Sequence, residues 1–507
     1  MKFDLEATLI FSDSVEEAVK DIEEAIRESN ETLLKKGVPE SVEDGGADVR
    51  GFSVEKDTLT LNIDSDRYVR AHDALLRLKK RLNKELGPEH HVGVRELSID
   101  GYAIELDLDR APKDPEKITL PYVEEVSFDE KRCVLKISEL GEKELKENYV
   151  DRIIERLKEK VDAQYYEGKE EMWELLWGSD EKEMAWEKDP TEEMLERDWI
   201  KRGPTKGKWF YRPEMAKVLK TIEKIAVKEV LKPLGFQEIV ESMMVPFDVW
   251  IETGHMEGIP NEAYYVTEPK TRNPGEWEEI IDEIKIARDV PDEKLEDMIE
   301  TPKAGICYAQ CPTIYWSFRN ETISDDSLPV LVYERTVPSA RYESGGRHGL
   351  ERVDEFHRIE PVYIGTKEQL LELKEKLIER YKHVFEEVLD IEWRMAKVEP
   401  FYLQQSGGSE KEEELDLGTV DFEAYLPYRG TREESEWLEF GNLSVFRKYT
   451  ESFNIKSQSD TLLSGCTGIG LERWAMAFLG QKGLDRENWP EKFDDYFGDM
   501  PDGFELL

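Results

Sequence analysis

The residues best suited to chemistry lie in a glycine-rich stretch that begins at Arg341. Arg341 and Glu343 stand two positions apart, so on a strand both side chains would project from the same face. A guanidinium group matches the geometry of phosphate and carboxylate groups. Three glycines would let the following loop close over such a ligand: Gly345, Gly346 and Gly349. The stretch therefore indicates a site for an anionic ligand, with a surface ion pair between Arg341 and Glu343 as the alternative.

Thiols are few. The chain has 4 cysteines, which are Cys133, Cys307, Cys311 and Cys466. In a chain of 507 residues they are not a disulfide framework, so a reducing, cytoplasmic setting is expected. Cys307 and Cys311 form a C-x-x-x-C spacing that could hold a structural zinc ion.

Charge limits the partners that such sites can serve. Lys and Arg number 70 against 114 Asp and Glu, which gives a formal net charge of −44. The chain as a whole should repel nucleic acid, so a nucleic-acid role needs a local basic patch or a salty cell interior that screens the repulsion. No apolar run of about 18 residues is present, and no signal-peptide layout starts the chain, so a membrane partner is not expected.

The elements that position these residues divide the chain into an expected three parts. Residues 1–165 alternate strand-like and helix-like segments and predict an α+β domain, with an antiparallel sheet of about six strands and helices on one face. A helix is expected from about Arg67 to Leu86, ending at Gly87-Pro88. Short turn signals at Asp100-Gly101 and at residues 129–131 favour hairpins.

One face of the helix expected near residues 67–86 is basic. It carries four cationic side chains: Arg70, Arg77, Arg81 and Lys84. One interpretation is a solvated face paired with neighbouring acids. The other is a contact surface for an RNA backbone.

The rest of the chain is expected to form a linker and one large domain. Residues 166–207 are charged and predict a helical linker whose tryptophans dock on a neighbouring surface. Residues 208–507 follow an α+β pattern with a mostly antiparallel sheet flanked by helices, interrupted by two short helices at about 274–301. Neither a Walker A motif nor G-x-G-x-x-G is present, so the common nucleotide fingerprints do not apply.

Three stretches, in order along the chain, resemble the signature motifs of class II aminoacyl-tRNA synthetases. They are residues 232–246, residues 341–360 and Gly468-Ile469-Gly470-Leu471-Glu472-Arg473. The finer resemblance is to seryl-tRNA synthetase. It rests on Thr253-Gly254-His255, on Arg-x-Glu followed by Gly-Leu-x-Arg-x-x-x-Phe-x-x-x-Glu, and on the segment from Glu439 to Ser444.

One departure narrows the family. The common seryl enzymes carry Thr-x-Glu ahead of the second motif, whereas this chain has Ala309-Gln310-Cys311-Pro312-Thr313. In this it resembles the rarer zinc-dependent, methanogenic-type (archaeal) seryl-tRNA synthetases. Residues 1–165 show no sustained heptads, so the coiled-coil arm of the common branch is not expected.

The resemblance implies the activation of serine by ATP and transfer of the seryl group to tRNA(Ser), and to the selenocysteine tRNA where one exists. Arg341, Glu343 and Arg473 would be catalytic residues. The ATP site, with Mg²⁺, would comprise these three and Arg352, Phe356, Glu439 and Asn442. Phe356 would lie under the adenine and Arg473 over it. The alternatives are a core aromatic for Phe356 and a helix-surface charge for Arg473.

The resemblance also implies one Zn²⁺ per subunit, held by Cys311, Glu360 and Cys466, with an open fourth position for the amino group of serine. Cys307 then becomes a buried small residue. Gln405 would read the serine hydroxyl, with Gln404 as its rival, and Ser444 would line the substrate pocket beside Glu360. Packing or surface roles remain the alternative for the metal residues, and hydrogen bonding to the backbone for the polar ones.

The resemblance implies a homodimer joined through the first motif. It also implies that the N-terminal domain binds the tRNA, and no DNA partner is expected. Two other functions are compatible with parts of the sequence. One is a related enzyme that makes an adenylate without charging tRNA, and the basic helix argues against it. The other is a non-enzymatic RNA-binding protein, against which the intact Arg341, Glu343 and Arg473 argue.

Overall fold

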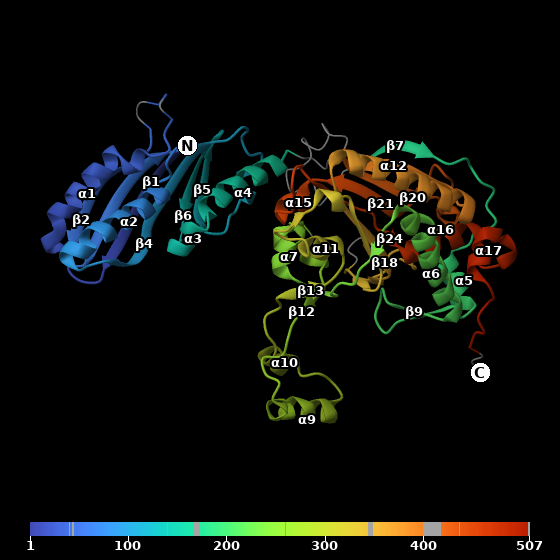
Figure 1. Ribbon diagram of the computed structural model, residues 1–507. Coiled ribbons are helices and arrows are strands. Elements are labelled where there is room, and N and C mark those ends of the chain that lie inside the picture. Colours follow the sequence, from blue (N-terminus) through green and yellow to red (C-terminus); the bar gives the residue numbers. More distant parts are fainter. Residues whose placement is uncertain are drawn as a thin grey trace. The chain divides into compact units, whose positions relative to one another are not determined.

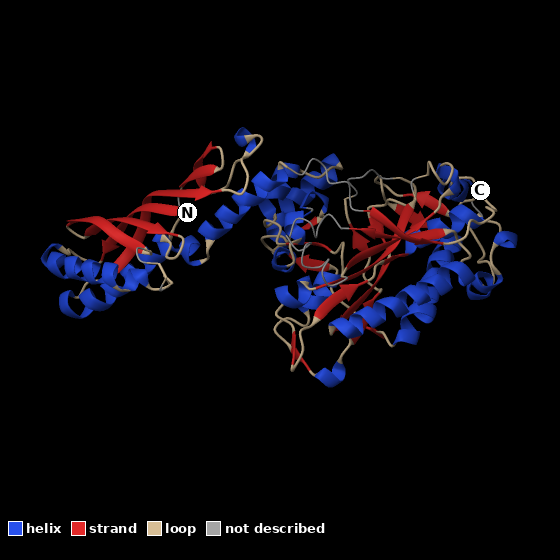
Figure 2. Cartoon of the chain, turned by 90° about the horizontal axis from the view of Figure 1, so that it is seen from above, coloured by secondary structure: helices blue, strands red, loops and turns tan. Residues whose placement is uncertain are grey.

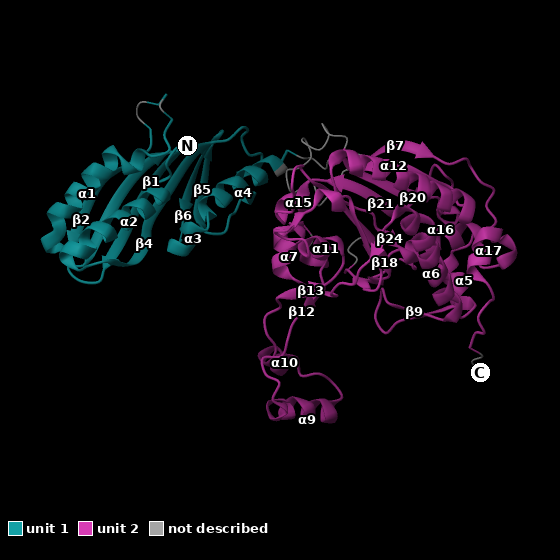
Figure 3. Cartoon of the chain, in the orientation of Figure 1, with its two compact units in different colours: residues 1–169 teal, residues 170–507 magenta. Residues whose placement is uncertain are grey.

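The computed structural model describes residues 1–39, 41–42, 45–138, 140–165, 173–258, 260–342, 348–398, 417–435 and 437–504 (Figure 1). The chain divides into two units, Met1–Lys169 and Glu170–Leu507 (Figure 3). Each unit has a hydrophobic core of its own. In the described part of the chain, none of the helices has the length and apolar character that crossing a bilayer requires.

Unit 1 is built on alternation of buried and exposed residues along its strands. Strand β1 (Lys2–Phe11) buries every second side chain from Phe3 to Phe11. The sheet has 6 strands in the order β2-β3-β1-β4-β6-β5, with all pairs antiparallel. The other strands are β2 (Ala47–Glu55), β3 (Thr58–Asp66), β4 (Val94–Asp107), β5 (Val123–Asp129) and β6 (Arg132–Ile137). This confirms the predicted N-terminal sheet.

Helices cover one side of the sheet of unit 1 (Figure 2). They are α1 (Val19–Glu31), α2 (Ala71–His90), α3 (Glu142–Lys146) and α4 (Tyr149–Ala163). Helix α2 buries Leu75, Leu78 and Leu82 against the strands. The stripe of apolar residues at helical spacing thus gives the sheet its second layer.

Two local predictions in unit 1 are wrong. Asp100-Gly101 makes no hairpin, because β4 runs through it as one strand with a bulge where Glu6 pairs with Gly101 and Ala7 with Ile99. A bulge absorbs the extra residue that a turn signal suggested. Helix α2 also continues past Pro88 to His90, and it is capped by His91, whose φ is 57° and whose N–H donates to Gly87 O. Pro88 has no N–H to donate to the carbonyl of Lys84, so the helix loses one hydrogen bond, but this loss falls in the last turn, where little helix follows it.

Unit 2 is built on a 9-stranded sheet, in the order β10-β15-β18-β23-β21-β20-β19-β7, with β24 pairing beside β18 and β21. All its pairs are antiparallel except β10 with β15. The strands are β7 (Trp173–Gly178), β10 (Gln237–Glu238), β15 (Val330–Glu334), β18 (Arg358–Gly365), β19 (Trp393–Val398), β20 (Gly418–Ala424), β21 (Leu438–Phe446), β23 (Leu463–Cys466) and β24 (Ile469–Gly470). The predicted mostly antiparallel sheet is confirmed.

Two cores lie on the two faces of this sheet. The larger core joins the sheet to α6 (Pro213–Ile225), α12 (Lys367–His383), α16 (Leu471–Lys482) and α17 (Glu491–Phe497). The smaller core lies on the opposite face, under α7 (Phe247–Glu252), α11 (Cys311–Trp316) and α15 (Lys448–Ser452). The alternation along β18 divides its side chains between the two, with Tyr363 on the larger core and Val362 on the smaller.

The segment predicted as a helical linker differs from that prediction. Its described part contains β7, the short α5 (Pro190–Glu196) and β8 (Ile200–Arg202), which forms a hairpin with β9 (Trp209–Tyr211) just after the segment. Strand β7 pairs with β19, and the Trp177 ring lies 4.8 Å from that of Trp393. The tryptophans do pack on a neighbouring surface, as expected, but the element that carries Trp177 is a strand at the edge of the large sheet and not a helix.

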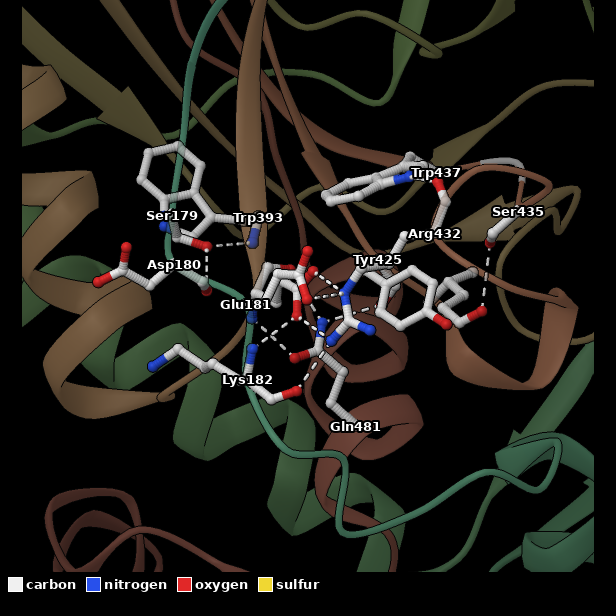
Figure 4. Close-up of polar contacts among 12 residues, drawn as sticks. Ser179, Asp180, Glu181, Lys182, Trp393, Tyr425, Arg432, Ser435, Trp437 and Gln481 are labelled. Atoms are coloured by element: carbon white, nitrogen blue, oxygen red, sulfur yellow. Dashed lines mark hydrogen bonds and ion pairs between the residues drawn. The ribbon is translucent and has the colours of Figure 1, made fainter.

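A polar cluster fastens the segment that follows β7 (Figure 4). Arg432 donates to both oxygens of Glu392 at 2.7 and 2.8 Å and to the carbonyl of Lys182 at 2.9 Å. Gln481 donates to Glu392 O and to Tyr425 O, each at 2.9 Å. Glu392 is only 2% exposed, so this pair holds a buried charge.

Two short helices interrupt unit 2 where the sequence predicted them. They are α9 (Glu278–Ala287) and α10 (Asp292–Met298), separated at Val290-Pro291. A small sheet stands at their base, formed by β11 (Met244–Pro246), β12 (Tyr265–Val266) and β13 (Ala304–Ile306).

Candidate active site

The centre of the site is a cluster of two thiols and one carboxyl on the sheet face that carries the smaller core. Glu360 is the third residue of β18, Cys466 ends β23, and Cys311 begins α11. Their ligand atoms all lie within 4.8 Å of one another, and all three residues are buried. The structure thus brings together three residues that are far apart in the sequence, at a spacing suited to one metal ion.

Glu360 is buried without the hydrogen bonds that a buried carboxyl requires. It is 0% exposed, and neither oxygen meets a donor in good hydrogen-bond geometry within the described part of the chain. Its charged neighbour is the guanidinium of Arg358, which forms an ion pair with it. Burial raises the pKa of Glu360, and Arg358 opposes that rise. A metal ion bound by the carboxylate would add the direct ligand contact that the ion pair with Arg358 does not provide.

The donor set fits zinc. Two sulfurs and one oxygen occupy three tetrahedral positions and leave one open. The hydrogen bond with Cys311 and burial together raise the pKa of Cys466 well above its usual range. A divalent ion at the cluster would reverse that preference, because it stabilises the thiolates.

Cys307 takes no part in the cluster. It is 0% exposed, and burial raises its pKa well above that of a free thiol. The only groups of potential metal ligands in the described residues are the one containing Cys311 and an exposed set at Asp21, Glu89 and His90. A structural zinc ion on the C-x-x-x-C pair therefore has no support.

Ser444 lies directly beside the cluster. It is the register partner of Cys466 between β21 and β23, and it is 2% exposed. Its hydroxyl lies 2.8 Å from that of Thr419. Asn442, two positions earlier on the same face, accepts from the N–H of Gly468 at 3.1 Å. Asn442 thus holds the loop after Cys466 through a hydrogen bond to its backbone. Hydrogen bonding to the backbone was the alternative to a role in the ATP site.

The predicted ATP residues lie on elements next to the cluster. Arg341 follows β16 (Ser339–Ala340), and Phe356 ends β17 (Glu355–Phe356), the antiparallel partner of β16. Arg341 pairs with Glu262 at 3.2 Å through Nε. Phe356 is half-buried against the larger core. Arg352 is half-buried in a turn, where its backbone N–H and C=O form hydrogen bonds with the backbone of His348.

Arg473 and Glu439 are brought into contact. Arg473, in the first turn of α16, donates through Nη1 to the carboxylate of Glu439 at 3.1 Å and to its carbonyl at 3.0 Å. Its Nε donates to Glu351 O at 3.3 Å. These contacts orient the guanidinium, while 29% of the side chain stays exposed. An oriented and accessible guanidinium suits a nucleotide site.

Three predicted residues lie outside the described residues, namely Glu343, Gln405 and its rival Gln404. Two of the loop glycines, Gly345 and Gly346, also lie outside them. Their roles remain predictions. All the other predicted ATP, serine and metal residues belong to unit 2.

The basic face of α2 in unit 1 is largely paired. Arg70 contacts Asp151 at 2.5 Å, and Arg81 contacts Glu28 at 2.5 Å and Glu85 at 2.8 Å. Arg77 donates to Lys36 O at 2.9 Å. Lys84 is exposed. Intramolecular acids thus neutralise part of this face, as the first of the two interpretations held.

Sequence reasoning missed several residues of the site. Arg358 lies next to Glu360 of the cluster, and its guanidinium packs against Gly468. A Cβ atom at Gly468 would come within 2.6 Å of Arg358 Nη2, so only glycine fits there without a shift. Glu241 has both oxygens buried without a hydrogen-bond partner among the described residues, and burial beside Glu334 and Glu360 raises its pKa to about 9. Arg358 could have been found, since it stands two positions before Glu360 on a strand whose remaining residues are apolar or aromatic. Glu241 carried no such signal.

The fold and this site define a class II aminoacyl-tRNA synthetase. Residues 347–486 match the family model of the class II tRNA synthetase core domain (F), and residues 1–159 match a tRNA-binding domain. The crystal structure of M. kandleri SerRS in complex with A. aeolicus tRNASec is similar over 100% of this chain and 99% of that one, with a TM-score of 0.85 and 31% identity.

Curated relatives narrow the family. The chain is 44% identical to the type-2 serine–tRNA ligase of Methanococcoides burtonii, over 100% of both chains. It is also 44% identical to that of Methanothrix thermoacetophila, again over 100% of both. The chain belongs to the type-2 serine–tRNA ligase family, which confirms the resemblance that the three motifs and the AQCPT segment carry.

Proposed function

We propose that this serine–tRNA ligase binds serine through its amino group, on a zinc ion held by Cys311, Glu360 and Cys466. The observation that carries the proposal is the buried cluster of two thiols and an unsatisfied carboxyl within 4.8 Å. A zinc ion bound there would supply a Lewis acid with one open position for a nitrogen ligand. It would orient the amino acid and leave the chemistry of activation to other groups.

In the first step an oxygen of the serine carboxylate attacks the α-phosphorus of ATP. A P–O bond forms, the bond to the bridging oxygen breaks, and pyrophosphate leaves with Mg²⁺. Arg341 would hold the carboxylate and the α-phosphate together, because one guanidinium can bind both. Arg473, aligned by Glu439, would lie over the adenine and reach the terminal phosphate. Positioning and charge stabilisation account for this reaction without a covalent nucleophile.

In the second step a terminal hydroxyl of the tRNA attacks the carbonyl carbon of the seryl adenylate. The ester forms, the bond from carbon to the AMP oxygen breaks, the hydroxyl proton passes to a phosphate oxygen of the departing AMP or to water, and AMP leaves. We propose tRNA(Ser) and the selenocysteine tRNA as acceptors. The tRNA-binding domain that residues 1–159 match supports this role of unit 1. The M. kandleri SerRS structure supports it as well, because the partner in that complex is a tRNASec.

For the serine hydroxyl, Gln405 remains the predicted reader, with Gln404 as its rival. Ser444, which places a nearly buried hydroxyl opposite Cys466, would line the same pocket. A site that hydrogen-bonds a substrate hydroxyl rejects the analogue that lacks it, because its own polar groups are then left unpaired. We further propose a cytoplasmic homodimer joined through α6 and the strand after it.

The test is serine-dependent exchange of pyrophosphate into ATP on the full chain, before and after treatment with a chelator. Exchange should fall on chelation and return with Zn²⁺. Cys466→Ser should lower it by more than about 100-fold, since even indirect disturbance of metal ligands costs about 10–100-fold. The control is Cys133→Ser, a buried thiol in unit 1. Full exchange in a protein shown to be metal-free would refute the zinc site.

A further inference from the structure

The phenol of Tyr449 lies against the thiol of Cys311. The hydroxyl oxygen is 3.5 Å from Sγ, within range of a hydrogen bond to sulfur. Tyr449 is 3% exposed, and no motif of the sequence includes it. A polar group buried at this place is expensive unless it makes a specific interaction.

Aromatic contacts hold the Tyr449 ring in place. The ring stacks on Tyr315 with centroids 4.6 Å apart and planes at 23°. The imidazole of His255 stacks at 6.2 Å and 16°. Tyr315 is itself fixed, because its hydroxyl donates to Gly465 O at 2.6 Å. Tyr315 and His255 therefore hold the phenol oxygen next to Cys311, and neither of them belongs to the proposed metal ligands.

The hydrogen-bond network fixes what the hydroxyl can do. Thr253 donates its proton to Val249 O at 2.8 Å, so it must accept from His255 Nδ1, which lies 2.9 Å away. His255 is neutral, because burial and nearby Lys448 lower its pKa to about 3. Its Nε2 is then an acceptor, 3.4 Å from the Tyr449 oxygen. Among the described residues, His255 Nε2 and Cys311 Sγ thus compete for the phenol proton.

We infer that Tyr449 is a positioning residue for the metal-bound amino acid, which donates its hydroxyl proton to the Cys311 thiolate when the metal is bound. A thiolate is charged and attracts the proton more strongly than a neutral imidazole does. The hydrogen bond withdraws charge from the sulfur and makes the metal a better acceptor for the serine amine. This inference rests on the proposed metal site and names a residue that tunes it.

Cobalt substitution tests the inference on the full chain. Co²⁺ in place of zinc shows absorption bands from thiolate-to-metal charge transfer. Tyr449→Phe keeps the stacked ring and removes only the hydroxyl. We expect these bands to move to longer wavelength, because the sulfur becomes richer in electrons. We also expect the KM for serine to rise about tenfold, with the KM for ATP unchanged.

Two further variants complete the experiment. His255→Leu removes the competing acceptor, so its bands should move to shorter wavelength. Tyr102→Phe is the matched control, because it removes another buried tyrosine hydroxyl, 2.7 Å from His72 in unit 1. Its spectrum and serine KM should equal those of the unmodified chain.

Two outcomes would overturn the claim, and they are distinguishable. A Tyr449→Phe protein with an unchanged spectrum and an unchanged serine KM removes Tyr449 from the site and leaves the metal in place. A parent protein without thiolate–cobalt bands, or with bands that are unchanged in both Cys466→Ser and Cys311→Ser, removes the proposed metal site itself and the inference with it.

Discussion

His357 sits in the second motif, beside a buried acid of the third. Its Nδ1 lies 2.7 Å from Glu472 Oε1, and its backbone N–H donates to the other oxygen at 2.9 Å. Glu472 is 1% exposed, whereas 47% of the His357 side chain is exposed. The hydrogen bond to Glu472 raises the pKa of His357 despite partial burial. A protonated His357 therefore joins the two motifs electrostatically.

Stability should depend on pH through this pair. Because the folded state raises the pKa of His357, its contribution is complete below the unfolded value of about 6.5 and disappears as pH rises through the folded value. His357→Gln should therefore lower the free energy of unfolding more at about pH 5.5 than at about pH 9. Denaturant unfolding at the two pH values measures this difference.

The control for His357 is a double-mutant cycle. In a Glu472→Gln background, the effect of His357→Gln should lose its pH dependence, because the acceptor no longer carries a charge. A pH dependence that survives Glu472→Gln would assign it to another group.

At the scale of elements, the chain after β7 depends on one buried ion pair. Arg432 makes two hydrogen bonds to Glu392 and one to Lys182 O. Arg432→Met would leave Glu392 buried without its counter-charge. We expect a loss of about 3 kcal/mol in the free energy of unfolding, measured by denaturant titration.

Lys376→Met is the matched control for Arg432. Lys376 pairs with Glu372 at 2.7 Å on an exposed helix face. Its loss should cost no more than about 0.5 kcal/mol. Equal effects of the two substitutions would show that the cluster does not fasten the segment after β7.

Much of the site could be predicted because the sequence carried it in local patterns. Arg341 and Arg473 stand in motifs whose order along the chain is informative, and Cys311 stands where a different residue was expected. Tyr449 and Glu241 carried no such signal. Tyr449 reaches Cys311 only through the packing of α15 on α11, and Glu241 approaches Glu360 across the edge of the sheet. Such contacts join segments that are far apart in the chain. They depend on the tertiary structure, so a local sequence motif does not predict them.

The fold showed the same limits. The alternation of apolar and polar residues predicted both sheets, because a strand that is buried on one face has a hydrophobic period of two in its sequence. It failed at Asp100-Gly101, because a bulge and a hairpin turn recruit the same residue types. It failed again at 173–178, where a tryptophan-containing run in a charged segment is a strand that pairs only with a distant partner.

At the scale of the whole molecule, the net charge of −44 sets the conditions for tRNA binding. Arg70 and Arg81 are neutralised by acids, whereas Lys84 is exposed and available for a phosphate. Lys84→Ala should lower the salt dependence of tRNA(Ser) affinity by about one unit of the log–log slope. Filter binding or fluorescence titration across salt concentrations measures that slope.

Arg27→Ala is the control for Lys84, since Arg27 is exposed on α1 and paired with Glu24 and Glu31. Its slope should match that of the unmodified chain. An unchanged slope for Lys84→Ala would move the tRNA contact away from this face of α2.

The short run from Cys466 to Arg473 joins a proposed metal ligand to a residue proposed to hold ATP. Between them, Gly468 is bonded to Asn442, and Ile469 pairs with Ile359 on the strand that carries Glu360. A displacement of either end of this run is therefore passed to the other. If the proposed metal and ATP sites are both occupied, we expect the two to be in thermodynamic linkage: each should tighten the other by the same factor, so a subunit depleted of metal should bind ATP more weakly.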